Sequence, residues 1–567
     1  MDNDLSIFEE LSVERKRLQK EGKLPEFFTT MGWQVFKSKY LHDATTYEEQ
    51  IDRIVNTVSN YCPTKKAYFK KRWKDMLMNN HAYLATPTLA NTGTNRGLSV
   101  SCSGGEITDD IYGFGDARTE CSVLSQEGFG TSSNLGSIRE RGSPISRGGK
   151  ANGVLPVFED MVKMAENVSQ GGTRRGAWAG YLPLEHGDFW EVADFVKNNP
   201  EGANVGWNIY DSTIKKLNQG DTDIQARYQR SLLVKCIHGK GYYYFPDKVN
   251  RASPQMYKDL GLKSLASNLC TEITLHADKD HSYSCVLSGM VGTTWDEWKD
   301  TDAVYCMTVF LDCLISEFLS LAKDIRGLEK IVRGTEKGRA LGLGFSGLHS
   351  LFQKKSLPFG CLEAHFLNNE IFSHLQEESL KASQWMAKEW GEPEWCEGYG
   401  VRNTHRTALA PNVSSSVIFG SESQGCTPWY GNVYSEGSAS GSLFRVNPLF
   451  IELLKKYNKY DEDTLQLVLN DNGSCQKLDF LTEHEKDVFK TAFEINQKDI
   501  LRLVSTRQPK ICQAQSTNLF IDADEDEAYI SEIHQEAFED ENIHSLYYLR
   551  GRAGVTASKG GCSACES

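Results

Sequence analysis

The hexapeptide Ser267-Asn268-Leu269-Cys270-Thr271-Glu272 places a thiol between an amide and a carboxylate. A cysteine is most often a small buried hydrophobe, and taken alone the stretch is compatible with that ordinary interpretation. A loop that only fills the core, however, has no need of Asn268 and Glu272 beside Cys270. A carboxylate close to a thiol is a candidate general base, so the stretch indicates a reactive site.

Further motifs surround this stretch in a fixed order along the chain. Each is weak by itself, but together they resemble the large subunit of class I ribonucleotide reductases, from about Gly32 to the C-terminus. The resemblance implies an enzyme, a ribonucleoside-diphosphate reductase that makes deoxyribonucleotides for DNA synthesis by thiyl-radical chemistry. The motifs are Ala85-Thr86-Pro87-Thr88, Val100-Ser101-Cys102, Gln170-Gly171-Gly172-Thr173-Arg174-Arg175-Gly176-Ala177, Tyr283-Ser284-Cys285-Val286-Leu287-Ser288, Ala410-Pro411-Asn412-Val413-Ser414-Ser415-Ser416, Leu546-Tyr547-Tyr548-Leu549-Arg550 and Cys562-Ser563-Ala564-Cys565.

The resemblance implies a ten-stranded α/β barrel, in which two five-stranded parallel halves run antiparallel to each other and Cys270 lies on a central finger loop. The local patterns favour an α/β fold as well. Apolar residues at three- and four-residue spacing predict an N-terminal helical region over 1–80. From 81 to 552, the expected catalytic domain, strand-like runs alternate with helices. We expect strands over 241–245, 340–345 and 416–419, and a flexible tail over 553–567, which is rich in Gly, Ala and Ser.

The bulk composition excludes several classes of protein. The chain has 567 residues and a net charge of −14, which argues against nonspecific nucleic-acid binding. No apolar run reaches the ~20 residues of a membrane helix, and the N-terminus lacks the apolar stretch of a secretory signal. We therefore expect a cytoplasmic protein that contacts neither membrane nor nucleic acid directly, with its 15 cysteines mostly reduced.

The resemblance assigns roles around the reactive stretch. Cys270 would form the thiyl radical, Glu272 would take the 3′-hydroxyl proton as general base, and Asn268 would hold a substrate hydroxyl. Cys102 and Cys285, 183 residues apart, would supply two electrons by forming a disulfide. Two unrelated core cysteines are the alternative.

Cys562 and Cys565 form a C-x-x-C pair near the end of the chain. Such a pair can be half of a zinc site, but zinc needs four ligands and the sequence has no second C-x-x-C or C-x-x-H. The resemblance favours a mobile dithiol that re-reduces the active-site disulfide and is itself reduced by thioredoxin or glutaredoxin. No metal site is expected.

Tyr547 and Tyr548 indicate which class of ribonucleotide reductase the chain resembles. In class I enzymes such a pair carries the oxidising equivalent from a separate small subunit to the thiol. The alternative is the class II family, which makes its radical from adenosylcobalamin; cobalamin dependence would separate the two.

Substrate phosphates need hydroxyl groups and free backbone amides. By resemblance Ser414 and Ser415 supply them, with contributions from Thr86 and Ser101. An ordinary serine-rich loop is the alternative, and Val413 stands where some members of the family have an acidic residue.

Regulation by nucleotides is also implied. Asp109, Asp110 and Arg139 resemble part of the site that binds a deoxynucleotide or ATP effector, within a region of about 100–180. Gln170 and Arg174 lie in the stretch that resembles the loop reporting effector identity to the substrate site. No other cofactor is expected. The short stretch before Gly32 leaves no room for the ATP-cone domain that many members carry.

Two further expectations complete the interpretation. The resemblance implies ribonucleoside diphosphates as substrates, a radical-generating small subunit as partner and a homodimer. A noncatalytic, nucleotide-binding paralogue is the alternative from another class of function. Such a paralogue would be expected to lose Cys270, Glu272 or the tail cysteines, and all of them are present.

Overall fold

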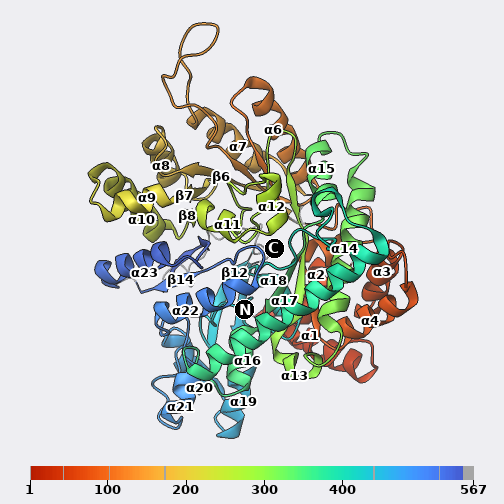
Figure 1. The fold of residues 1–567 in the computed structure, drawn as a ribbon. Helices are drawn as coiled ribbons and strands as arrows, with labels where there is room; N and C mark the ends of the chain where they lie inside the picture. The colour runs from red at the N-terminus through yellow and green to blue at the C-terminus, as the bar shows by residue number, and fades with distance from the viewer. Residues whose placement is uncertain are drawn as a thin grey trace.

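The computed structural model describes residues 2–41, 44–100, 102–170, 174–438, 441–522 and 524–552 (Figure 1). Threonine caps start two of its first four helices. The side chain of Thr29 accepts a hydrogen bond from the Gly32 amide, and that of Thr46 accepts one from the Glu49 amide. The predicted N-terminal helical region is therefore present. Its helices are α1 (Asp2–Lys20), α2 (Thr30–Lys39), α3 (Tyr47–Ser59) and α4 (Lys66–Met78).

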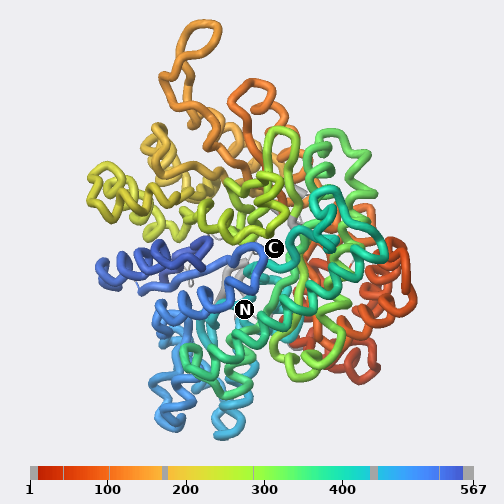
Figure 2. The backbone as a smooth tube through the Cα atoms, viewed as in Figure 1, coloured from red at the N-terminus to blue at the C-terminus, as the bar shows by residue number. Residues whose placement is uncertain are grey.

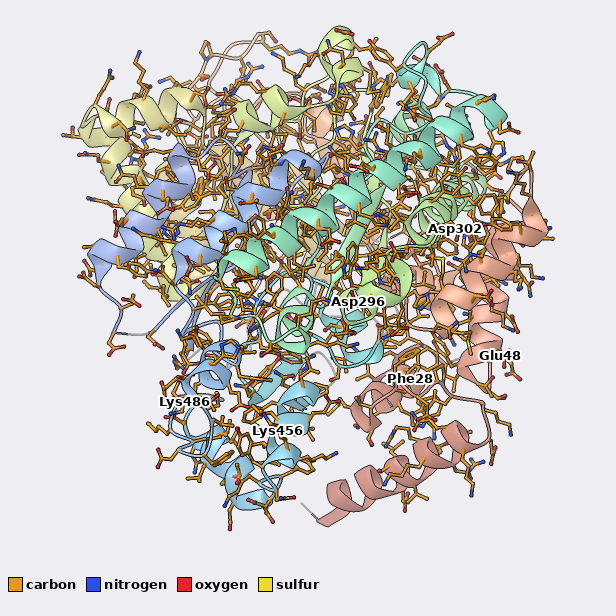
Figure 3. All side chains as sticks on the ribbon, turned by 60° about the horizontal axis from the view of Figure 1, so that its bottom comes forward. Phe28, Glu48, Asp296, Asp302, Lys456 and Lys486 are labelled. Atoms are coloured by element: carbon orange, nitrogen blue, oxygen red, sulfur yellow. The ribbon has the colours of Figure 1, made fainter. Side chains whose placement is uncertain are left out.

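The N-terminal helices pack against the long core helix α14 (Ala303–Ala322). The indole nitrogen of Trp73 donates a 2.8 Å hydrogen bond to the Cys306 carbonyl. Arg72 forms an ion pair with Asp302, directly before α14. Figure 3 shows Asp302 at the boundary between the N-terminal helices and the rest of the chain. Side-chain contacts therefore fasten this region to the barrel.

The first half of the barrel is a set of five parallel strands. Their order in the sheet is the same as their order in the chain, and helices connect them. The strands are β2 (Cys102–Glu106), β3 (Gly130–Asn134), β6 (Ala177–Pro183), β7 (Asn204–Asn208) and β8 (Tyr242–Tyr244). The helices are α6 (Ile111–Gln126), α7 (Leu155–Asn167), α8 (Phe189–Asn198), α9 (Asp211–Asn218) and α10 (Thr222–His238).

The second half also consists of five parallel segments. Strand β10 (Leu287–Val291) pairs with β11 (Gly342–Ser346), and β14 (Leu519–Ile521) pairs with β16 (Leu549–Gly551). Two parallel bridges, Leu343–Thr407 and Leu409–Gln515, connect these pairs through the segment around residue 408. The helices between these strands include α15 (Glu329–Gly338), α16 (Leu348–Lys354), α17 (Leu362–Trp390), α22 (Gln497–Arg507) and α23 (Glu527–Glu539).

Two seams join the halves. At the first seam, β9 (Tyr283–Cys285) runs antiparallel to β2 and continues, after Val286, into β10. At the second seam, β15 (Ser545–Leu546) runs antiparallel to β8 and continues, after two residues, into β16. Figure 2 shows this last, blue segment returning to the yellow segment that contains α10. The predicted barrel of two antiparallel halves is thereby confirmed.

The remaining elements cover the barrel or extend from it. Strand β1 (Ala82–Leu84) lies antiparallel to β10. The others are β4 (Ser169–Gln170), β5 (Arg174–Arg175), β12 (Val433–Ser438), β13 (Gly441–Val446), α5 (Thr86–Asn91), α11 (Pro246–Ala252), α12 (Gln255–Leu260), α13 (Trp295–Trp298), α18 (Val413–Ile418), α19 (Pro448–Lys456), α20 (Glu462–Asn470) and α21 (Glu483–Val488), with short 3-10 turns at Gly292–Thr294, Glu394–Cys396 and Gln508–Lys510.

The sequence prediction was wrong for residues 416–419, which belong mainly to helix α18 and not to a strand. Asn412 takes a left-handed backbone conformation (φ 46°) immediately before the helix. This turn redirects the chain, so the apolar residues Val417 and Ile418 become buried on a helix. A short apolar run cannot by itself distinguish the two structures.

Among the described residues, α14 is the one helix long and apolar enough to cross a membrane, with a mean hydropathy of 1.7. The sequence reading had found no apolar run of that length. In the fold, 72% of its most apolar window is buried against other protein segments. The apolar composition of α14 is therefore explained by its burial in the protein core.

Candidate active site

The loop between α12 and β9, residues 262–282, is held from both halves of the barrel. From the first half, the Ser132 hydroxyl on β3 donates a 2.8 Å hydrogen bond to the Ser267 carbonyl. From the second half, the Ser516 hydroxyl donates a 2.6 Å hydrogen bond to the Cys270 carbonyl. These contacts place the loop between the two halves, as expected for the predicted finger loop.

The tip of the loop is a buried, internally bonded turn. The Asn268 side chain donates to a Glu272 carboxylate oxygen at 2.9 Å, and its own oxygen accepts from the Ile273 amide at 3.0 Å. Thr271 takes a left-handed backbone conformation (φ 70°), which closes the turn. Asn268 and Glu272 are fully buried, and Cys270 is 5% exposed. The structure thus brings together the three residues that the sequence motif singled out.

Burial changes the acidity of the Glu272 carboxyl. It raises the pKa to about 8, and the electrostatic effect of the nearby Cys102 acts in the same direction. Hydrogen bonds from Asn268 and, at 3.1 Å, from Ser516 favour the carboxylate and oppose the rise. A pKa close to the working pH suits a group that takes and returns a proton.

The predicted cysteine pair meets at the first seam. In the β2–β9 ladder Cys102 lies directly opposite Cys285, although 183 residues separate them in the chain. Directly opposed residues have Cβ atoms about 4.5–5.5 Å apart, close to the separation in a disulfide. The Cys285 side chain lies outside the described part of the structure.

Cys270 itself is in the oxidised state in this structure. Its sulfur is disulfide-bonded in this structure. Radical chemistry at this residue would require the free thiol.

Aromatic rings connect the loop with the second seam. The rings of Tyr547 and Tyr548 lie 4.1 Å apart between their centroids, and both side chains are buried. Tyr242 on β8 lies 4.8 Å from Tyr547 and 5.7 Å from Tyr548. Cys270 belongs to the same buried cluster as these rings. These buried rings and Cys270 therefore belong to one cluster at the tip of the loop.

The candidate phosphate-binding segments also meet. Ser414 and Ser415, both buried, lie in the first turn of α18. The Ser415 hydroxyl donates a 3.1 Å hydrogen bond to the Leu84 carbonyl, two residues before Thr86. The Thr86 hydroxyl in turn is 3.1 Å from that of Tyr40. Ser101 lies outside the described residues.

The candidate effector residues lie at the start of α6 and beyond. Arg139 forms an ion pair with Asp109. Asp110 caps α6 by accepting hydrogen bonds from two backbone amides, which lower the pKa of its carboxyl. Gln170 and Arg174 are directly opposed in the β4–β5 hairpin, and their side chains lie outside the described part.

Sequence reasoning missed Ser516, Tyr242 and the buried Lys235, whose side-chain nitrogen donates hydrogen bonds to the carbonyls of Gly241 and Tyr547. Each acts on the site from a segment distant in the chain, and no short spacing pattern marks it. The tail cysteines Cys562 and Cys565 lie outside the described residues.

Comparisons with known proteins agree with this architecture. The family model described as the ribonucleotide reductase barrel domain matches residues 100–222, 207–398 and 393–549, and the model described as the all-alpha domain matches 26–97. A Frog virus 3 protein is 30% identical over 535 residues, covering 90% of this chain and 93% of that protein. The ribonucleoside-diphosphate reductase large subunit of Invertebrate iridescent virus 3 is 28% identical, covering 94% and 95%.

A solved structure is similar over most of its length. The class Id ribonucleotide reductase alpha subunit of Actinobacillus ureae matches with a TM-score of 0.86 and 33% identity, covering 93% of this chain and 97% of that one. These matches favour class I over the cobalamin-dependent alternative and an enzyme over a noncatalytic paralogue. Together with the barrel and its central loop, they show that the chain belongs to the large subunits of class I ribonucleotide reductase.

Proposed function

We propose that this large subunit reduces ribonucleoside diphosphates to 2′-deoxyribonucleoside diphosphates by a thiyl radical at Cys270. The observation that carries the proposal is the buried tip of the loop, where Asn268 and Glu272 flank Cys270 and hydrogen bond to each other. The 2′-carbon of a ribose is unactivated. A hydrogen atom must therefore first be removed from the neighbouring 3′-carbon, and a thiyl radical can remove it because S–H and C–H bonds are similar in strength.

The oxidising equivalent enters through Tyr548 and Tyr547. Tyr548 lines a cleft of about 1390 Å³ between α10 and α23, where the apolar side chains Leu233 and Ile237 are exposed. We propose this cleft as the place where the separate small subunit docks. A proton and an electron leave Tyr548, then Tyr547, then Cys270. The contact between the two rings and the buried cluster that they share with Cys270 support a relay through these residues.

The reduction itself balances with one cysteine pair. The Cys270 thiyl takes the 3′-hydrogen atom, Glu272 takes the 3′-hydroxyl proton, and the 2′-hydroxyl leaves as water. Cys102 and Cys285 lose two electrons and two protons and form a disulfide: one proton leaves with the 2′-hydroxyl as water, and the other proton and the two electrons supply the new hydrogen on the 2′-carbon. Glu272 returns its proton to the 3′-oxygen. The hydrogen atom then returns from Cys270 to the 3′-carbon. Asn268 orients Glu272 through their hydrogen bond, and it would also hold a substrate hydroxyl.

The substrate diphosphate would lie against Thr86, Ser101, Ser414 and Ser415. The support is the hydrogen bond between Ser415 and the segment that leads to Thr86. Hydroxyl groups and amides at the start of a helix suit phosphate oxygens.

Effector binding and turnover complete the proposal. A deoxynucleotide or ATP effector would bind near Asp109, Asp110 and Arg139, and the segment containing Gln170 and Arg174 would transmit its identity in a homodimer. We assign residues 1–80 to a helical domain, 81–552 to the barrel with the effector region at about 100–180, and 553–567 to a redox-active tail. In that tail, Cys562 and Cys565 would pass electrons from thioredoxin or glutaredoxin in the cytoplasm.

The test is a Cys270→Ser variant assayed with its cognate small subunit, a ribonucleoside diphosphate and a dithiol. A serine O–H bond is much stronger than S–H, so no deoxynucleotide should form while substrate binding persists. Cys361→Ser is the matched control, because Cys361 caps α17 with its side chain and serine is a good helix cap. Product formation by Cys270→Ser at any measurable rate would refute the assignment.

A further inference from the structure

Two imidazoles and one carboxylate meet where the loop that carries Cys270 returns to strand β9. They belong to His276, Asp278 and His281, and one ligand-type atom from each lies within 4.8 Å of the other two. The Nε2 atom of His276 is 3.1 Å from Asp278 Oδ2, and the Nδ1 atom of His281 is 2.9 Å from Asp278 Oδ1. In the part of the chain that the structure describes, this is the one group of three His, Cys, Asp or Glu side chains that converges so closely.

The backbone of Lys263 holds the other nitrogen of the His276 ring. Its carbonyl oxygen lies 2.9 Å from Nδ1, and its amide nitrogen lies 3.1 Å from the same atom. The ring can accept from the amide and donate from Nε2 to Asp278, or it can donate from Nδ1 to the carbonyl, which leaves the lone pair of Nε2 free. The second arrangement is usual in metal sites, because the outer hydrogen bond fixes the tautomer and makes the ligating nitrogen more basic. His276 can therefore become a ligand without a movement of its ring.

Backbone amides hold the Asp278 carboxylate in place. Its Oδ1 atom accepts hydrogen bonds from the amides of Asp280 and His281, each at 2.8 Å. Its other oxygen, Oδ2, faces His276. A carboxylate that its own turn has already ordered loses little conformational entropy when it binds an ion, so this oxygen is preorganised for a ligand.

Trp395 packs against both imidazole rings. Its ring centroid is 5.9 Å from that of His276 and 5.4 Å from that of His281. The side chains of the two histidines are 12% and 16% exposed, and that of Asp278 is 37% exposed. An ion can therefore reach the cluster from solvent, while the indole limits the movement of the rings.

The type of donor atoms favours a transition-metal ion over a purely hydrogen-bonded clamp. Two imidazoles and one carboxylate are a donor set for Zn²⁺ and Fe²⁺, whereas Mg²⁺ and Ca²⁺ prefer oxygen ligands alone. Tetrahedral ligands at 2.0–2.1 Å from zinc are about 3.3 Å from one another. The two nitrogen–oxygen distances of 3.1 and 2.9 Å in the cluster are close to this value, so an ion would need only small shifts of the side chains.

We propose that His276 Nε2, His281 Nδ1 and Asp278 bind a divalent transition-metal ion, with water in the remaining positions. The expectation of no metal site rested on the C-x-x-C pair alone. The ion would join the two ends of the loop, since His276 contacts Lys263 near its start and His281 lies two residues before β9. Strand β9 contains Cys285 and pairs with β2, so the ion would also steady the strand of the proposed reductant. The site does not depend on the radical mechanism.

The experiment measures metal binding by the full-length chain after treatment with a chelator. Zn²⁺ and, without oxygen, Fe²⁺ are titrated in competition with a chromophoric chelator, and bound metal is counted by elemental analysis. Co²⁺ reports the ligand type, because thiolate ligands add a near-ultraviolet charge-transfer band that nitrogen and oxygen ligands lack. We expect one ion per chain with nitrogen and oxygen ligands, bound more tightly as Zn²⁺ than as Fe²⁺, the order that such ligands follow.

Three single variants each remove one ligand and preserve the shape of the side chain. In His276→Gln and His281→Asn an amide nitrogen replaces Nε2 and Nδ1, respectively, and Asp278→Asn keeps the acceptor for the backbone amides. Loss of an outer hydrogen-bond partner alone costs about 10- to 100-fold in metal affinity, so each variant should lose at least about 100-fold. His484→Gln is the matched control, because this exposed histidine lies 3.1 Å from the Ser356 hydroxyl, and it should bind metal as the native chain does.

Hydrogen exchange of the loop gives a second measurement on the native chain, which stays valid if a variant folds poorly. At a free Zn²⁺ concentration of about ten times Kd, opening of residues 263–282 should be suppressed roughly tenfold by mass action. Unchanged exchange with Zn²⁺ bound would overturn the proposed joining of the loop ends.

The other outcomes are equally decisive for the site. The absence of an ion with nitrogen and oxygen ligands from the native chain would refute it, as would full retention of that ion in the three ligand variants. Equal loss in His484→Gln would indicate unspecific association with surface histidines and would also overturn the proposal.

Discussion

The Ser516 hydroxyl donates a 2.6 Å hydrogen bond to the carbonyl of Cys270, which lies 246 residues earlier in the chain. The same hydroxyl is 3.1 Å from the carboxylate of Glu272. One side chain from the second half of the barrel thus positions both the proposed radical residue and the proposed base.

Replacing Ser516 by alanine should shift the acid limb of the pH–rate profile upwards. A hydrogen bond to the charged form lowers the pKa of Glu272, and its loss, worth about 1.5 kcal/mol, corresponds to about one pH unit. The measurement is kcat between pH 6 and pH 9. Ser545→Ala is the control, because Ser545 donates to the Thr271 carbonyl on the same loop. Equal shifts in both variants would show that general loosening of the loop is responsible.

Glu272→Gln should remove activity and increase stability at alkaline pH. The folded-state pKa of Glu272, about 8, lies above its unfolded value. Its contribution to stability is therefore full below the unfolded pKa and is lost as the pH rises through 8. Glutamine mimics the neutral form, so the variant should gain up to about 4 kcal/mol relative to wild type near pH 8, and little near pH 5. Denaturant unfolding at both pH values tests this. A gain that is the same at both would contradict the assigned ionisation.

Tyr547→Phe and Tyr548→Phe should each abolish turnover and leave substrate affinity nearly unchanged. Phenylalanine preserves the packing of the ring cluster but has no phenol to oxidise. Steady-state assays and equilibrium substrate binding measure the two effects separately. Tyr243→Phe should retain most activity. Activity of more than a few percent in either relay variant would contradict the sequential path.

Loss of both tail cysteines should depend on the reductant. A Cys562→Ser/Cys565→Ser variant should lose turnover with thioredoxin, because a protein cannot enter the barrel, but retain most of it with dithiothreitol. Thiol–disulfide exchange needs direct contact between the sulfur atoms, which a small dithiol can achieve. Equal loss with both reductants would indicate a structural role for these thiols, and no loss with thioredoxin would exclude a role in turnover.

The sequence predicted the parts of the site that are local in the chain. Asn268 and Glu272 flank Cys270 within five residues, and the turn that joins them is a short-range structure. The prediction of the barrel rested on the order of several motifs along the chain. That order indicated the family, and no single motif would have indicated it. Apolar residues at three- and four-residue spacing predicted the N-terminal helical region, which contains α1 to α4.

The contacts that tune the site could not be predicted in this way. The site is contacted by Ser516, Tyr242 and Lys235 only because strands that are distant in the sequence pair with each other. A single serine, tyrosine or lysine in a sequence does not indicate such a contact. Asp110 is a different case. The sequence analysis predicted it as an effector-binding residue, and in the structure its carboxylate also caps helix α6. The turn at Asn412, which converts an apolar run into α18, likewise depends on a single backbone conformation.

The two seams lie at opposite ends of the five-stranded first half, with Cys102 on its first strand and Tyr242 on its last. In the proposed mechanism, the tyrosine oxidant at the second seam and the Cys102–Cys285 reductant at the first seam therefore lie at opposite edges of this sheet. A phenoxyl radical in direct contact with the dithiol would be reduced by it, and the oxidising equivalent would be lost before it reached Cys270. The sheet then keeps the two sites apart, and among the described residues the loop carrying Cys270 lies between the two halves of the barrel.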